Sequence, residues 1–174
     1  MSDTQTGTQS GAQTGAATVP TPPPAPHELR IESVIVPVAD VERSKDFYVG
    51  RLGWRLDADF AIPDGLAVVQ LTPPGSPTSI AFGAKISAAA PGSLDSLLLA
   101  VHDVEAARED LRARGVDVSD VFHDAGGAFH HAGDDQRAPG PDPQRRSYAS
   151  FASFQDPDAN TWYLQEIRDR LPGR

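Results

Sequence analysis

The sequence contains two related copies of one pattern, and this duplication constrains the fold more than any other feature. At an offset of 63 residues, the same residue types recur at Val38 and Val101, Asp40 and Asp103, Val41 and Val104, and Glu42 and Glu105. With a gap of one residue, Gly53 also falls on Gly115. One copy is too small to cover its own curved sheet, so we expect the two copies to join edge to edge.

Each copy reads as a strand, a helix and three further strands. Runs of β-branched and aromatic residues predict the strands, and an Asp before a helical stripe predicts each helix start. In the first copy the predicted helix covers 41–51 and the strands cover 29–38, 54–60, 67–72 and 79–82. In the second copy the helix covers 104–114 and the strands cover 96–101, 116–122, 147–154 and 161–165. The joined sheets would form a cup with the helices outside and a ligand inside.

Two segments fall outside this pattern. Residues 1–27 contain one charged side chain, Asp3, no Leu, Ile, Phe, Tyr or Trp, and five prolines, which predicts a disordered tail. The remaining domain spans 28–170, with modules at about 29–86 and 94–168. Within the second module, residues 123–146 form an insertion rich in Gly, Asp, His and Pro, which we expect to cover the cup as a lid.

Composition excludes several classes of protein. The chain has 15 Lys and Arg against 24 Asp and Glu, a net charge of −9, which argues against nucleic-acid and anionic-membrane partners. It has no Cys, so disulfide frameworks, thiolate metal sites and cysteine nucleophiles are excluded. There is no apolar run of membrane-spanning length and no secretory signal pattern. We therefore expect a soluble, cytoplasmic protein.

Four stretches resemble the vicinal oxygen chelate superfamily, which includes glyoxalase I, extradiol dioxygenases, and the fosfomycin- and bleomycin-resistance proteins. They are residues 36–48, 52–56, 101–107 and 154–160, the last containing Asp-Pro-Asp-Ala-Asn. The resemblance spans about 29–167. It implies an α+β fold in which two βαβββ modules form a cupped mixed sheet, with helices outside. It also implies a homodimer as the expected assembly.

The resemblance further implies where a metal site would lie, and this chain lacks its ligands. In metal-dependent relatives, His, Glu or Gln occupies four strand positions facing into the cup. Three of these positions correspond to Ser33, Ser96 and Tyr163, and the fourth falls in the strand 79–82, which contains no ligand type. Serine hydroxyls and aliphatic side chains are poor ligands for divalent metals. We therefore expect no metal and no cofactor.

The expected lining of the cup is largely apolar and aromatic with a few neutral polar groups. By alignment it consists of Ser33, Ile35, Gln70, Ile80, Phe82, Ser96, Leu98, Ser153, Tyr163 and Gln165. Such a lining suits a small, partly aromatic molecule held by shape and stacking. The alternative is that these residues fill the cup as an ordinary core, because Leu, Ile and Phe at alternating spacing are typical of one.

The insertion keeps a second possibility open. His123, His130 and His131 lie close to Asp124, Asp134 and Asp135, a set that could bind a metal away from the usual site. Alternatively, His123, His130 or Tyr163 could transfer protons as a general acid or base. The sequence contains no Gly-x-Ser-x-Gly nucleophile motif, no Walker phosphate-binding loop and no Gly-x-Gly-x-x-Gly dinucleotide-binding motif.

Two functions remain as hypotheses. The first is a metal-independent protein that binds an apolar or aromatic metabolite in its cup, similar to the antibiotic-sequestering members of the superfamily. The second is a lyase, isomerase or dioxygenase-like enzyme with a relocated metal or histidine-based catalysis. The sequence leaves open whether any reaction is catalysed.

Overall fold

The computed structural model describes residues 23–127, 129, 133 and 135–171. The chain divides into two units, Met1–Arg30 and Ile31–Arg174. In the first unit, the described residues 23–30 contain a turn in which the Glu28 amide donates to the Ala25 carbonyl at 2.9 Å. Most of the predicted tail lies outside the described residues. The second unit contains the strands and helices of both modules.

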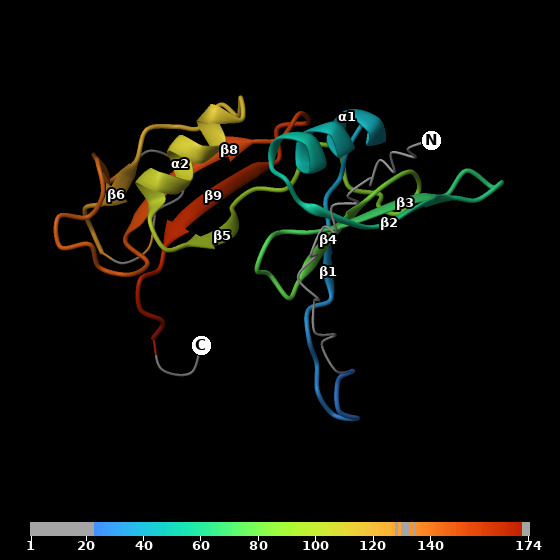
Figure 1. Ribbon diagram of the computed structural model, residues 1–174, viewed down its shortest axis with the longest axis horizontal. Helices are drawn as coiled ribbons and strands as arrows, with labels where there is room; N and C mark the ends of the chain where they lie inside the picture. The colour runs from blue at the N-terminus through green and yellow to red at the C-terminus, as the bar shows by residue number, and fades with distance from the viewer. Residues whose placement is uncertain (1–22, 128, 130–132, 134, 172–174) are drawn as a thin grey trace, which may run out of the picture. The chain divides into compact units, whose positions relative to one another are not determined.

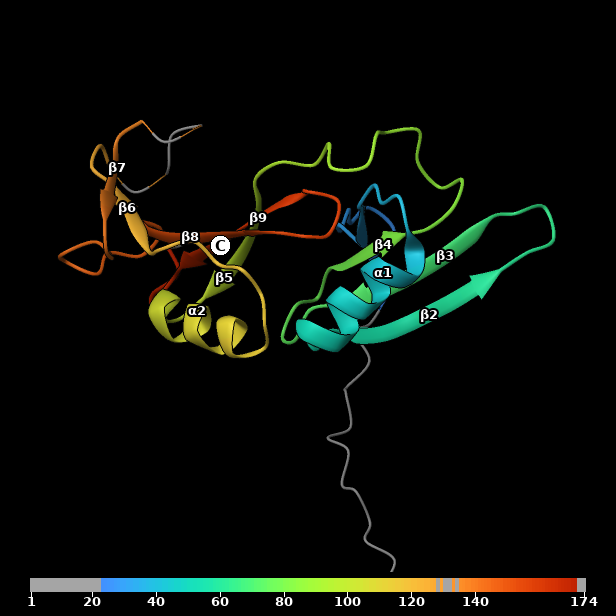
Figure 2. The ribbon, with the colours of Figure 1, turned by 90° about the horizontal axis from the view of Figure 1, so that it is seen from above.

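The first module contains one sheet of four strands. Its elements are β1 (Ser33–Ile35), the helical turns α1 (Val41–Lys45) and η1 (Asp46–Arg51), β2 (Arg55–Ala61), β3 (Ala67–Thr72) and β4 (Ser79–Phe82). The strand order is β1-β4-β3-β2, with β1 parallel to β4 and the other pairs antiparallel. Figure 2 shows β2 and β3 running side by side to their hairpin turn. This is the predicted βαβββ module, although β1 is shorter than the predicted strand at 29–38.

The second module repeats this arrangement and adds a strand. Its elements are β5 (Leu97–Val101), α2 (Val104–Ala113), β6 (Phe122–Asp124), β7 (Arg137–Pro139), β8 (Ser150–Gln155) and β9 (Thr161–Glu166), in the order β5-β9-β8-β6-β7. The parallel pair of β5 and β9 matches that of β1 and β4. The additional strand, β7, comes from the insertion, part of which therefore extends the sheet.

The predicted strand at 116–122 is wrong in its extent. Only an isolated bridge between Val118 and Phe154 forms there, and the regular strand begins at Phe122. Ser119 explains the interruption, because its hydroxyl oxygen accepts from the Ser153 amide at 2.9 Å. A side chain thus occupies the place that a backbone carbonyl would take in a regular ladder.

The helix boundaries agree with the predicted signals. Asp40 accepts a hydrogen bond from the Arg43 amide at 3.0 Å, and Asp103 accepts from two amides, so both carboxylates cap their helices. Gly53 and Gly115 come after the helices with φ values of 71° and 78°, in the left-handed region that favours glycine. Among the described residues, no helix has the length and apolar character needed to cross a membrane.

The two modules share one hydrophobic core. Both helices lie on the same side of the strands (Figure 1). Rings from the two modules meet beneath them, with 5.0 Å between the centroids of Tyr48 and Trp54 and 5.3 Å between those of Trp54 and Trp162. Val69 and Leu71 of the first module and Phe154 and Leu164 of the second belong to the same buried cluster. Burial of this shared surface is the main stabilising term between the modules.

A buried polar network also joins the modules. The Tyr48 hydroxyl donates to Asp156 Oδ2 at 2.7 Å and accepts from Trp162 Nε1 at 3.2 Å. The amide of Asn160 donates to the same Asp156 oxygen and to the Pro37 carbonyl at 3.0 Å. Burial raises the pKa of Tyr48, and the neighbouring Asp156 charge raises it further, so the hydroxyl remains a donor. The Asp-Pro-Asp-Ala-Asn turn therefore holds the first helix.

Candidate functional site

Each sheet has a helix face, packed against the core, and an opposite face that we call the cup face. Since side chains alternate along a strand, the buried cluster assigns the faces. In the first module Val69, Leu71, Ile80 and Phe82 lie on the helix face. The cup face then carries Ser33, Ile35, Gln70, Thr72, Ser79 and Ala81.

The expected orientation of Ile80 and Phe82 is wrong. Phe82 is fully buried, with its ring centroid 5.6 Å from that of Tyr48 under the helix. The error is a register shift of one residue on β4, which exchanges the two faces of a strand. Ser79 and Ala81 occupy the cup face in their place. Ser33, Ile35 and Gln70 lie on the predicted face.

In the second module the predicted face is correct for four residues. Trp162, Leu164 and Phe154 lie on the helix face, so the paired strands place the alternating residues on the cup face. These are Leu98, Phe122, Phe151, Ser153, Tyr163 and Gln165. Ser96 is exposed just before β5, with a φ of 65°. The Gln165 side-chain amide donates to the Tyr148 backbone carbonyl at 3.2 Å, so it stabilises the segment before β8.

An aromatic cluster of Phe122, Phe151 and Tyr163 occupies the cup face of the second sheet. The rings of Phe122 and Phe151 are stacked with centroids 5.7 Å apart, and Tyr163 meets Phe122 edge-on at 6.4 Å. Arg137 of β7 places its guanidinium carbon 4.3 Å from the Phe122 centroid and donates to the Tyr163 hydroxyl at 3.1 Å. All three rings are buried, so the insertion places a cation against a buried aromatic cluster.

A small hollow lies between the two modules, lined by residues of β1, β4, β5 and β9 that come from both faces of the sheets. It has a volume of about 130 Å³, and its walls are mostly aliphatic. Ser79 and Ser76 of the first module, and Leu98 and Trp162 of the second, contribute to the lining. Leu98 is 40% exposed, and Ile35 on the cup face of β1 is 37% exposed. Apolar side chains thus remain open to a ligand in this region.

A row of hydrogen-bonded polar side chains reaches the hollow from β2. The register of β2 and β3 shifts between Leu56 and Ala58, and Asp57 lies at this bulge. Its carboxylate accepts from the Thr72 hydroxyl and from Arg55 Nε, the latter at 2.6 Å. The Thr72 and Ser79 hydroxyls are 2.8 Å apart. Thr72 and Ser79 are both buried.

The two acid–base candidates that the structure describes, His123 and Tyr163, lie on opposite faces of the second sheet. His123 neighbours Phe122 on β6, so its side chain lies on the face away from the aromatic cluster. Its Nδ1 lies 2.9 Å from the Gly140 carbonyl, which as an acceptor requires the proton on that nitrogen. His130, His131 and Asp134 lie outside the described residues.

The residues at the superfamily's metal positions do not fit a divalent metal. They are Ser33, Ser96 and Tyr163, and β4 contributes only Ser79, Ile80, Ala81 and Phe82. Within the part of the chain that the structure describes, no three His, Cys, Asp or Glu side chains form a group able to hold a metal ion. Hydroxyl and aliphatic groups give a weak first coordination sphere.

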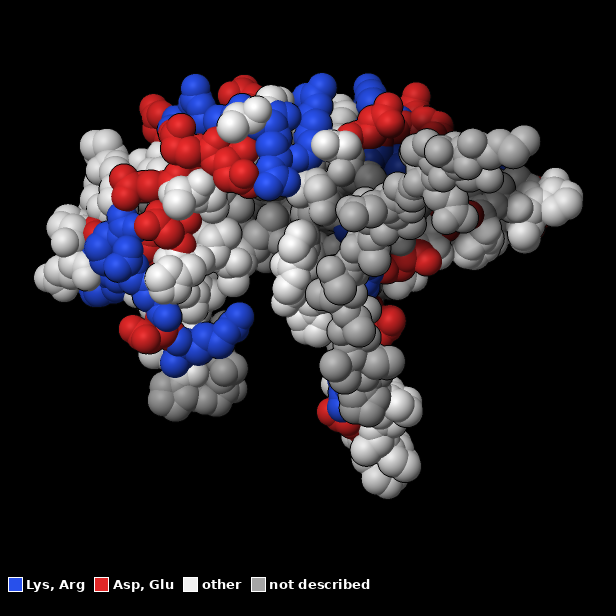
Figure 3. Space-filling view, in the orientation of Figure 1, with Lys and Arg blue, Asp and Glu red and all other residues white. Residues whose placement is uncertain are grey.

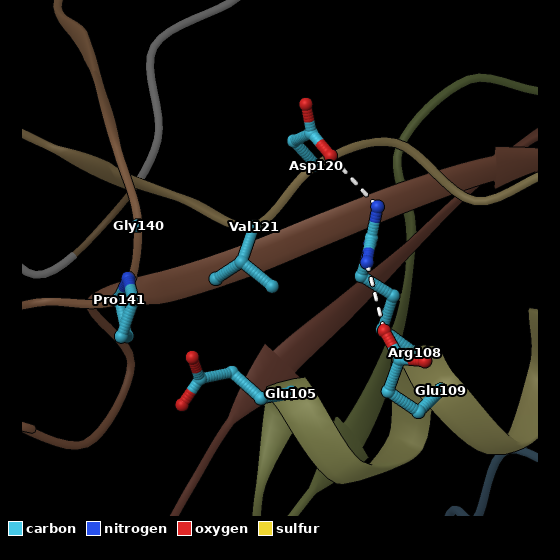
Figure 4. Close-up of a pocket in the computed structure, with 7 residues that line it drawn as sticks. All are labelled: Glu105, Arg108, Glu109, Asp120, Val121, Gly140 and Pro141. Atoms are coloured by element: carbon cyan, nitrogen blue, oxygen red, sulfur yellow. Dashed lines mark hydrogen bonds and ion pairs between the residues drawn. The ribbon is translucent and has the colours of Figure 1, made fainter.

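A second hollow, of about 210 Å³, lies beside α2 (Figure 4). Charged side chains line it, but Arg108 is already paired with Asp120 at 2.7 Å and with Glu109 at 3.0 Å. Charged residues of both signs gather over α1 and α2 (Figure 3). This outer, charged surface contrasts with the aliphatic and aromatic cup faces, so we place the candidate site on the latter.

The return of the insertion to β8 is anchored by ion pairs. Arg145 pairs with the fully buried carboxylate of Glu166 at 2.7 Å and with Glu105 of α2 at 2.6 Å. Asp142 is buried and pairs with Arg146 at 2.5 Å. The hydrogen bond from Arg146 lowers the pKa of Asp142 to about 2. These ion pairs fix the segment between β7 and β8 against α2 and β9.

We expect Asp142→Asn to lower the free energy of unfolding by about 1 kcal/mol near pH 6, since Arg146 is half exposed and solvent screens the pair. The folded-state pKa is below the ordinary value of 3.8, so this stabilisation is present above pH 4 and is lost as the pH falls towards 2. Urea unfolding of both proteins between pH 2 and 6 measures the difference. Asp95→Asn, at an exposed carboxylate, is the control; a pH-independent difference contradicts the prediction.

Several residues of the site were not predicted from the sequence. Thr72 and Ser79 flank the Pro73-Pro74-Gly75 turn, and a correct hairpin register would have placed them opposite one another. Phe151 alternates with Ser153 along β8, so it could have been assigned to the same face. Arg137 carries no local signal, because its position depends on β7 pairing with β6 across the insertion.

Comparisons with known proteins agree with this geometry. The family model Glyoxalase/Bleomycin resistance protein/Dioxygenase superfamily matches residues 30–164. TnmS3, an antibiotic binding protein from Streptomyces sp. CB03234, is 31% identical over 81% of this chain and 98% of its own, with a TM-score of 0.60. A glyoxalase/bleomycin resistance protein from the same organism is 32% identical over 79% of this chain and 100% of its own, with a TM-score of 0.57.

A third structure, a superfamily member from Sphaerobacter thermophilus DSM 20745, shares the fold. It is 24% identical over 80% of this chain and 98% of its own, with a TM-score of 0.55. A search of curated proteins finds no match. Together with the two sheets and shared core, these similarities confirm the predicted glyoxalase/bleomycin-resistance fold.

Proposed function

Because the chain belongs to the glyoxalase/bleomycin resistance protein/dioxygenase superfamily, we propose that it is a metal-independent binding protein for a small planar aromatic molecule of the antibiotic type. The ligand lies across the cup faces. It stacks near the aromatic cluster and reaches the aliphatic hollow between the modules. The observation that carries the proposal is the buried cluster of Phe122, Phe151 and Tyr163 on the face opposite the helices, beside Leu98, which is 40% exposed.

Two further observations support an aromatic ligand. Exposed Leu98 neighbours Tyr163 across the β5–β9 pair and also lines the hollow, so it presents apolar surface between the buried cluster and the hollow. The relative at 31% identity is described as an antibiotic binding protein, and its similarity covers most of both chains. Flat apolar and aromatic walls favour planar ligands, which bury much surface at a small cost in conformational entropy.

Metal independence is supported by the residues at the superfamily's ligand positions. Ser33, Ser96 and Tyr163 offer hydroxyls where a metal needs carboxylate or imidazole.

We also propose that the protein is a homodimer and that it is located in the cytoplasm. Light scattering tests the assembly, and cell fractionation tests the location.

Titration with two- and three-ring aromatic compounds and with bleomycin tests the proposal. We expect at least one planar compound to bind with a stoichiometry of one site per chain. At a ligand concentration of 100 times Kd, binding stabilises the folded protein by about 2.7 kcal/mol, which raises Tm measurably. Chromatography of the released ligand should show it unchanged, and metal analysis of protein purified without chelator should show less than one metal per chain.

The opposite results separate the alternatives. A chemically changed ligand in the absence of metal would indicate an enzyme that uses Tyr163 or a histidine for proton transfer. Stoichiometric metal would indicate the relocated site at the insertion. Failure of every aromatic compound to bind would overturn the proposed function.

A further inference from the structure

In the row of polar side chains from Asp57 through Thr72 to Ser79, the hydrogen-bond partners determine which group donates its proton in each contact. Asp57 is a carboxylate at neutral pH: partial burial raises its pKa, but the hydrogen bonds from Arg55 and Thr72 outweigh this, and the net pKa is lowered. An ionised carboxylate can only accept hydrogen bonds. The Thr72 hydroxyl, which contacts Asp57, must therefore donate its proton to it.

This donation fixes the next contact in the row. A threonine hydroxyl has one proton, and that of Thr72 is used by Asp57. The contact of 2.8 Å between Thr72 Oγ1 and Ser79 Oγ then requires Ser79 to be the donor. The Ser79 proton points to Thr72, and the oxygen of Ser79 keeps its lone pairs for other partners.

Ser79 lines the hollow between the modules, whose other walls are mostly aliphatic. The residue is only 7% exposed, so water has little access to its hydroxyl. A ligand group that enters the hollow thus meets an acceptor whose proton is already committed. A ligand oxygen without a proton would face the Ser79 lone pairs and would lose its own hydration without compensation.

We propose that Ser79, oriented by Thr72 and Asp57, makes this site select aromatic ligands that carry a hydrogen-bond donor, such as a phenolic hydroxyl or an amine. Ethers, and ring carbonyls in the same position, are disfavoured. The inference rests on the proposed function, since it specifies the ligand of the same site. Asp57 and Thr72 are positioning residues, and Ser79 contacts the ligand.

Three naphthalene probes test the inference: naphthalene, 2-methoxynaphthalene and 2-naphthol. Their Kd values are measured by calorimetry at pH 7. With the unmodified protein, we expect 2-naphthol to bind about three to ten times more tightly than the methyl ether, which is the range of one hydrogen bond. With Ser79→Ala, the two Kd values should become equal within about twofold.

Thr72→Val gives the sharper result, because it removes the acceptor of the Ser79 proton. Ser79 can then donate to the ether as well as accept from the naphthol, so we expect the two Kd values to become equal within about twofold. A merely structural role of Thr72 would weaken both probes alike and leave their ratio unchanged. Ser87→Ala, at an exposed serine outside the site, is the matched control, and thermal melting verifies that each variant is folded.

The outcomes distinguish the two proposals. Equal binding of naphthol and methyl ether to the unmodified protein would overturn the role of Ser79 and leave the aromatic-binding function standing. A ratio that persists in both Ser79→Ala and Thr72→Val would overturn it as well. If no naphthalene probe binds, the proposed function fails, and the inference fails with it.

Discussion

Replacing Asp156 by Ala is expected to lower the free energy of unfolding by about 3–5 kcal/mol, because several buried donors lose their acceptor at once. The carboxylate accepts from the Tyr48 hydroxyl at 2.7 Å and from the Asn160 side-chain amide at 2.8 Å. It also accepts from the backbone amides of Asp158 and Asn160, both at 2.9 Å. Urea unfolding monitored by tryptophan fluorescence measures the loss, since Trp54 and Trp162 lie beside this network.

Two comparisons define this result. Tyr48→Phe removes a single partner and keeps the ring in the core, so we expect a smaller loss of about 1–2 kcal/mol. Asp95→Ala, at an exposed position, should change stability by less than about 0.5 kcal/mol. Both modules should still unfold in one transition because they share a core. A loss below about 1 kcal/mol for Asp156→Ala would contradict the assignment of this turn as the joint between the modules.

Leu98→Glu is expected to weaken binding of a planar aromatic ligand at least about 100-fold, while the protein stays folded. The introduced carboxylate would lie in the aliphatic hollow and would have to lose its hydration when a ligand covers it. Leu98 is already 40% exposed in the unliganded protein, so the folded state gains no buried charge. Calorimetric titration gives the affinity, and thermal melting gives the stability.

Leu56→Glu is the matched control for this substitution. Leu56 is 45% exposed, also lies on a strand, and pairs with Leu71 on the helix face of its sheet. The Leu56→Glu substitution therefore introduces the same charge at a similar exposure, but on the helix face, away from the proposed ligand. Equal loss of affinity in the two variants would place the binding surface elsewhere.

Much of the fold could be predicted from the sequence because its signals are local. Asp40 and Asp103 cap their helices through nearby backbone amides, and Gly53 and Gly115 end them through backbone conformation. The repeat of these signals at a fixed offset predicted two like modules. The interruption before β6 was missed because it depends on Ser119 meeting Ser153, a residue 34 positions away.

The candidate site was predicted only in part because a face is a property of strand pairing. Ser33, Leu98 and Tyr163 were placed correctly, since β1, β5 and β9 have clear starting points next to caps and turns. Ile80 and Phe82 were misplaced because β4 consists of four buried residues, whose burial pattern does not distinguish its two faces.

The amino-acid sequence by itself determined the two modules, their helix boundaries, the absence of metal-ligand types at the superfamily's positions and the family to which the chain belongs. These depend on residue identity and on contacts between near neighbours. Only the tertiary structure decided that Arg137 lies over Phe122, and that Ser79 both contacts the Thr72 hydroxyl and lines the hollow. Both arrangements arise where distant strands pair, and hydrogen-bond direction is defined only once every partner in the row is in place.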